Sequence, residues 1–112
     1  MTRKFLAFDI ETATDVPGDD FNWRPFRPLG ISCAATFSTE DESPKLWHGG
    51  QGASTPTSKM QRHEAAQLVD YLVAMAKSEF TIVTWNGLAF DFDVLAEESG
   101  RLAECRRLAL EQ

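Results

Sequence analysis

Short apolar runs along the chain predict four β-strands. Residues 5–11 form an apolar and aromatic run that ends in charge, which is typical of a buried strand with polar residues at its C-terminal end. Residues 30–37 and 45–48 predict a second and a third strand, joined as a hairpin by an acidic turn at 39–44. Residues 80–85 favour a fourth strand, which an Asn-Gly turn ends.

The period of the apolar residues then predicts three helices. The first spans residues 58–78, with Ser58 and Gln61 forming a capping box at its start. The second spans residues 89–99 and ends at a glycine, and the third spans residues 101–112. The predicted order is β-β-β-α-β-α-α, which indicates an α/β fold.

A long connection separates the first two strands. Residues 13–29 contain three prolines, which predict a surface loop. Within it, residues 21–27 alternate aromatics with arginines, the residue types that stack the bases and contact the phosphates of a single nucleic acid strand. Burial is the commoner use of such aromatics, so we favour a loop pinned to the body of the protein.

Composition and charge narrow the class of protein. The 112 residues suffice for one domain, and 17 acidic against 11 basic residues give a net charge of -6. This balance disfavours a module that holds nucleic acid by basic charge alone, but it is compatible with carboxylates that hold divalent cations. Asp9 and Glu11 interrupt the apolar stretch near the N-terminus, so we expect no secretory signal and a cytoplasmic protein.

The two cysteines do not predict a metal site. Cys33 and Cys105 are far apart in the sequence, and neither has a second Cys or His at zinc-finger spacing. Each lies in an apolar run, so we expect both to be small buried residues rather than a disulfide.

Acidic residues at two element ends are the candidate chemistry. Asp9 and Glu11 are two apart in a strand and therefore project to the same side, where hard oxygen ligands suit Mg²⁺ or Mn²⁺. Taken alone, such a pair is more often a solvated acidic strand end. Asp91 lies early in the second predicted helix, on a face shared with apolar residues. Asp93 points elsewhere and is interpreted as a solvated first-turn acid.

Two segments together resemble a known family. Residues 8–12 (Phe-Asp-Ile-Glu-Thr) and 85–91 (Trp-Asn-Gly-Leu-Ala-Phe-Asp) resemble the first two motifs of the DEDD superfamily of 3′ to 5′ exonucleases, in the variant of the family B DNA polymerase proofreading domains. The resemblance implies a ribonuclease H-like mixed sheet with strand order 3-2-1-4-5. It also implies that residues 1–112 form a single, incomplete exonuclease domain that lacks the fifth strand and the last helix.

The resemblance also implies a site. Asp9, Glu11 and Asp91 would be catalytic and would bind two Mg²⁺ or Mn²⁺ ions beside the scissile phosphate. One ion would prepare the attacking water, and the other would stabilise the leaving 3′ oxygen. Three further residues of the motifs would bind the terminal nucleotides of the substrate: Thr12, Asn86 and Phe90.

The chain departs from the family after the second motif. The family has a third motif, an Asp on a downstream helix with a Tyr or His shortly before it. No Asp occurs after Asp93 here, and both histidines and the one tyrosine precede the second motif. Glu104 and Glu111 lack such a partner and are interpreted as solvated helix positions. For Phe90, plain core packing is an equal alternative to substrate binding.

Two functions follow as expectations. The first is a divalent-metal-dependent 3′ to 5′ exonuclease domain, a hydrolase acting on the 3′ end of single-stranded DNA or RNA, which is active only if a longer native chain supplies the missing third carboxylate. The second is a non-catalytic ribonuclease H-like module that binds nucleic acid or a protein partner. Under either, residues 81–85 would form an open sheet edge, which favours a homo-oligomer or pairing with a partner chain.

Overall fold

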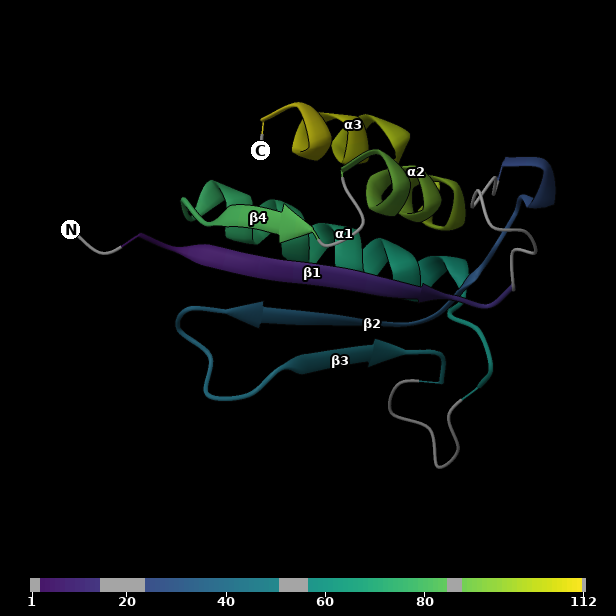
Figure 1. Ribbon diagram of the computed structural model, residues 1–112, viewed down its shortest axis with the longest axis horizontal. Coiled ribbons are helices and arrows are strands. Elements are labelled where there is room, and N and C mark those ends of the chain that lie inside the picture. The colour runs from purple at the N-terminus through teal and green to yellow at the C-terminus, as the bar shows by residue number, and fades with distance from the viewer. Residues whose placement is uncertain (1–2, 15–23, 51–56, 85–87, 112) are drawn as a thin grey trace, which may run out of the picture.

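Four strands form one mixed sheet in the order β3-β2-β1-β4 (Figure 1). β1 pairs antiparallel with β2 and parallel with β4, and β2 pairs antiparallel with β3. This computed structural model describes residues 3–14, 24–50, 57–84 and 88–111. The strands are β1 (Phe5–Thr12), β2 (Ile31–Ser38), β3 (Lys45–His48) and β4 (Thr81–Thr84).

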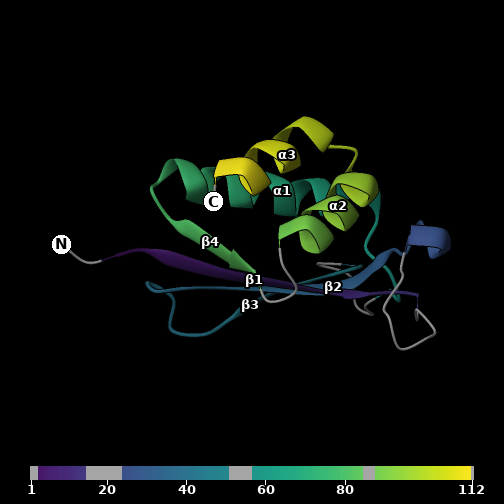
Figure 2. The ribbon, with the colours of Figure 1, turned by 45° about the horizontal axis from the view of Figure 1, so that its top comes forward.

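Three α-helices lie together on one side of this sheet, as Figure 2 shows. A short 3-10 helix, η1, precedes β2. The four helices are η1 (Arg24–Phe26), α1 (Arg62–Lys77), α2 (Leu88–Ser99) and α3 (Leu102–Glu111). The α/β class and the predicted element order are therefore confirmed. The predicted strand bounds, and those of the last two helices, agree within one residue wherever the structure describes them.

The core lies between the sheet and the helices. Along β1 the side chains alternate, so that Leu6, Phe8 and Ile10 are buried while their neighbours are not. α1 and α2 supply the facing residues, among them the fully buried Leu68 and Leu95. The alternation also fixes which residues of β1 lie on the opposite face of the sheet, where the candidate carboxylates are.

The first helix begins later than the sequence predicts. The expected start at Ser58 is wrong, because the Met60 amide donates a hydrogen bond to the carbonyl of Ile31, the first residue of β2, at 2.7 Å and not to a carbonyl within a helix. α1 begins after Gln61, whose amide donates to the Glu64 carboxylate at 2.8 Å. The capping box is therefore formed by Gln61 and Glu64 instead of Ser58 and Gln61.

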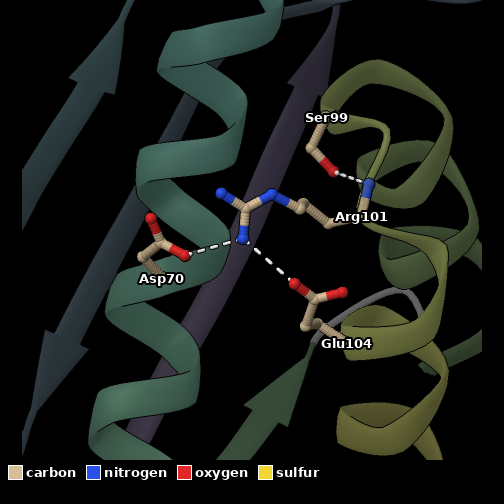
Figure 3. Close-up of polar contacts among 4 residues, drawn as sticks. All are labelled: Asp70, Ser99, Arg101 and Glu104. Carbon is tan, nitrogen blue, oxygen red and sulfur yellow. Dashed lines mark hydrogen bonds and ion pairs between the residues drawn. The ribbon is translucent and has the colours of Figure 1, made fainter.

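One arginine joins the three helices where α2 ends and α3 begins (Figure 3). The Arg101 guanidinium donates to Asp70 of α1 at 2.9 Å and to Glu104 of α3 at 3.0 Å. The Arg101 amide donates to the Ser99 hydroxyl at 3.1 Å. Gly100 makes this turn with a positive φ of 74°, a conformation that glycine adopts without strain.

The loop before β2 is attached to α2 by its arginines. The Arg24 guanidinium lies 3.4 Å from the Asp93 carboxylate, and that of Arg27 lies 3.5 Å from the Glu97 carboxylate. Attachment of this segment through its aromatic side chains, the expectation from the sequence, stays a prediction, because those side chains lie outside the part of the chain that the structure describes.

The two cysteines differ in exposure. Cys105 is buried as predicted, and burial raises the pKa of its thiol to about 12. The expectation of burial is wrong for Cys33, which is exposed because it lies on the face of β2 that no helix covers. Both thiols are free, so no disulfide joins them. Among the described residues no helix has the length and apolar character needed to cross a membrane.

Candidate functional site

The two acidic residues of the first motif lie at the C-terminal end of β1. Phe8 and Ile10 point to the core, so Asp9 and Glu11 lie on the opposite face of the sheet, as the strand period predicts. Asp9 is half-buried, whereas Glu11 is exposed. The register pairs Asp9 with Ala35 and Glu11 with Cys33 on β2.

The acidic residue of the second motif reaches β1 from the helix that follows β4. β4 pairs with β1 only as far as Phe8, and α2 begins four residues after β4 ends. The Phe92 ring packs on Phe8 with 5.8 Å between the ring centroids, which holds the first turn of α2 against β1. Asp91, the residue before Phe92, is consequently 0% exposed.

Three carboxylate oxygens of this pair are buried without a hydrogen bond. Asp9 Oδ1, Asp91 Oδ1 and Asp91 Oδ2 have no hydrogen-bond partner within the described parts of the chain. A buried polar atom left in this state costs about 1–3 kcal/mol, and more when the group is charged. Native proteins rarely retain such groups unless they bind something or store strain for function.

The two carboxylates are also coupled electrostatically. Two effects raise the pKa of Asp91 to about 7. Burial is the larger cause, and the negative charge of Asp9 is the second. The two groups therefore lie close enough for one charge to destabilise the other. Asp91 lies in the first turn of α2, and a helix N-terminus stabilises an anion by about 0.3–1 kcal/mol. This stabilisation offsets only part of the destabilisation of the Asp91 carboxylate by burial and by Asp9.

This pair fits a divalent cation. Carboxylate oxygens are the ligands that Mg²⁺ and Mn²⁺ prefer, and a cation removes both the unpaired state of the oxygens and the repulsion between them. Among the described residues no three His, Cys, Asp or Glu side chains gather closely enough to hold a metal ion. The part of Glu11 as a third ligand stays a prediction.

The predicted substrate-binding residues are placed as follows. The Thr12 hydroxyl donates to the Thr14 carbonyl at 3.0 Å, so it stabilises the end of β1. Phe90 is 8% exposed and belongs to the core, which is the alternative that the sequence leaves open for it. Asn86 lies outside the described residues.

A hollow beside Asp9 was not anticipated from the sequence. It has a volume of about 320 Å³, and it lies on the sheet face that the helices leave uncovered. Its exposed lining is mostly apolar and includes Ala7, Phe37, Pro44 and Val83. The signal for it is that Ala7, Phe37 and Val83, at paired outward positions of β1, β2 and β4, are apolar.

Comparison of the chain with protein-family models, with curated proteins and with solved structures found no match. The fold and the geometry of the acidic pair therefore carry the functional argument by themselves.

Proposed function

We propose that this chain is a divalent-metal-dependent 3′ to 5′ exonuclease domain that hydrolyses terminal phosphodiester bonds of single-stranded nucleic acid. The observation that carries the proposal is the pair of Asp9 and Asp91, whose buried oxygens have no hydrogen-bond partner among the described residues and whose mutual repulsion fits a divalent cation. A stable core does not require two carboxylates in this state, whereas metal-assisted phosphodiester hydrolysis uses carboxylates to hold a cation beside the phosphate.

The topology supports a ribonuclease H-like version of this fold. The observed order β3-β2-β1-β4, with β1 and β4 parallel and the other neighbours antiparallel, agrees with the first four strands expected from the exonuclease resemblance. The acidic residues also occur where that resemblance expects them, at the end of β1 and in the first turn of the helix after β4.

In this proposal Asp9 and Asp91 hold the cation, and both must be ionised to do so. A bound Mg²⁺ or Mn²⁺ would activate the attacking water and would supply positive charge to stabilise the leaving 3′ oxygen. Glu11, exposed two residues after Asp9, is proposed as the additional carboxylate. Because the pKa of Asp91 is about 7, cation binding should strengthen as the pH rises from 6 to 8.

The test is the shortening of a 5′-labelled single-stranded oligonucleotide, in DNA and RNA forms, with Mg²⁺ or Mn²⁺. We expect a ladder that begins at the 3′ end, stops in EDTA and stops when the 3′ end is blocked. Asp91→Asn and Asp9→Asn should each lose about 100-fold or more of the rate, the scale of losing one charge-stabilising group.

Asp93→Asn is the matched control, because Asp93 lies on the same helix but is exposed and paired with Arg24. It should keep the rate of the unchanged chain. Equal rates in the Asp91→Asn variant and the unchanged chain would assign the shortening to a contaminating nuclease and reject this site.

The second candidate is a non-catalytic ribonuclease H-like module that binds nucleic acid or a protein partner. Two observations favour it: β4 lies at the edge of the sheet, and the described residues hold a pair rather than a trio of metal-ligating carboxylates. Retained oligonucleotide binding without any shortening in Mg²⁺ or Mn²⁺ would select this candidate.

A further inference from the structure

The hollow on the open face of the sheet adjoins the candidate cation site. At its centre Ala7 of β1 is paired with Phe37 of β2 and with Val83 of β4, and all three line the hollow. Phe37 is 45% exposed and Val83 is 48% exposed, so a ligand can reach both side chains. Asp9, the next residue of β1 on this face, also lines the hollow. The hollow and the acidic pair of Asp9 and Asp91 therefore share one carboxylate.

The size and the lining of the hollow restrict what it can hold. Ala7 and Ala35 have no atoms beyond Cβ, so they leave space beside the larger side chain of Phe37. The volume of about 320 Å³ is at the lower end of the roughly 300–1,000 Å³ of ligand pockets, which suits one ring system rather than a length of chain. Of the described residues that line the hollow, only Asp9 is charged. The hollow therefore fits a small, uncharged group with apolar faces.

We propose that this hollow receives the base of the 3′-terminal nucleotide while the phosphate of that nucleotide lies at the cation held by Asp9, an inference that rests on the proposed nuclease function. A nucleobase is flat and uncharged, and aromatic side chains such as Phe37 are the usual surface on which bases stack. Ala7 and Asp9 are one strand period apart, about 6.6 Å. A single sugar joins the base of a nucleotide to its phosphate, so one nucleotide can reach both places.

This placement also defines the class of substrate. A terminal base that is paired in a duplex must leave its partner and its stack before it can enter the hollow, which is unfavourable. Single-stranded 3′ ends are therefore selected. Stacking on an apolar lining does not read the edges of a base, so the hollow accepts any of the four bases. It discriminates instead between a terminal nucleotide with a base and one without.

The test compares ligands that differ only by the base. The full chain, loaded with Mn²⁺ at pH 8, is titrated in a calorimeter with adenosine 5′-monophosphate and with ribose 5-phosphate, and then with the two deoxy forms. Neither ligand of a pair contains a phosphodiester bond, so no hydrolysis disturbs the binding. In at least one pair the nucleotide should bind about tenfold more tightly than the sugar phosphate, which is the scale of one stacked base.

Two variants of the hollow and one matched control locate this preference. Phe37→Ala removes the ring, and Ala7→Leu fills the centre of the hollow; both positions are exposed, so the variants should remain folded by circular dichroism. Each should bind the nucleotide and the sugar phosphate equally while keeping its affinity for Mn²⁺. Leu46→Ala is the control, because Leu46 is a 64% exposed apolar residue that the open face carries on β3, beside Ala35. It should keep the preference for the nucleotide.

The outcomes separate this inference from the proposed function. Equal binding of nucleotide and sugar phosphate by the unchanged chain, or an undiminished preference in Phe37→Ala, would overturn the inference while Mn²⁺ binding left the cation site in place. Loss of the preference in Leu46→Ala as well would show that the base binds elsewhere on the open face, which also overturns it. Absence of Mn²⁺ binding to the folded, unchanged chain would overturn the proposed function and this inference with it.

Discussion

Replacement of Asp91 by asparagine is expected to stabilise the cation-free protein at pH 8. The folded protein holds the pKa of Asp91 at about 7, against an ordinary value of 3.8. Between these two values the unfolded chain has already lost this proton while the folded protein keeps it, so the free energy of unfolding falls as the pH rises. Above pH 7 the loss is complete. At about 1.4 kcal/mol per pH unit, the loss of unfolding free energy reaches roughly 4 kcal/mol. A neutral side chain at position 91 avoids this penalty.

The measurement is urea unfolding in EDTA at pH 4.5 and pH 8. At pH 8 Asp91→Asn should exceed the unchanged chain in unfolding free energy by an amount up to this penalty. At pH 4.5, only 0.7 pH unit above the ordinary pKa of 3.8, the difference should shrink to about 1 kcal/mol or less. Asp93→Asn should differ by less than about 0.5 kcal/mol at both pH values, because Asp93 is exposed and makes only a surface ion pair. A less stable Asp91→Asn at pH 8 would show that the ionised carboxylate is satisfied in the folded protein.

Replacement of Phe8 by alanine is expected to cost about 3–5 kcal/mol, the usual loss for a buried phenylalanine. Phe8 is 1% exposed, and its ring packs on that of Phe92, next to Asp91. The variant therefore removes both core packing and the contact that holds the first turn of α2 against β1. Since small domains have only about 5–15 kcal/mol of stability, a partly unfolded population is expected at 37 °C.

Urea unfolding of Phe37→Ala provides the comparison. Phe37 lies on the neighbouring strand, one row away on the opposite face of the sheet, and is half exposed. At low protein concentration its loss should be below about 1.5 kcal/mol, because less apolar area leaves a buried environment. Equal losses in the two variants would contradict the assignment of the core to the helix-covered face.

Much of the fold was predictable because its strands are short apolar runs separated by clear turn signals. The start of α1 was not, since the backbone of Met60 is held by β2 through a contact between residues distant in sequence. The exposure of Cys33 was also missed. Its strand has polar Thr36 and Ser38 on the covered face and apolar Phe37 on the open face, so composition alone does not show which face the helices cover.

The candidate site was predictable in part. The strand period places Asp9 and Glu11 on one face, and the motif resemblance is what connected Asp9 to Asp91. The pattern did not show that Glu11 would be exposed while Asp9 is half-buried. The apolar open face was missed because it requires the register of three strands, which a single sequence does not reveal.

The central claim is that Asp9 and Asp91 together form a cation site, and calorimetric titration with Mn²⁺ or Mg²⁺ at pH 8 tests it most directly. The account predicts that the unchanged chain and Asp93→Asn bind the cation, and that Asp9→Asn and Asp91→Asn both lose binding while remaining folded. Absence of binding in the folded, unchanged chain, or undiminished binding in Asp91→Asn, would contradict it.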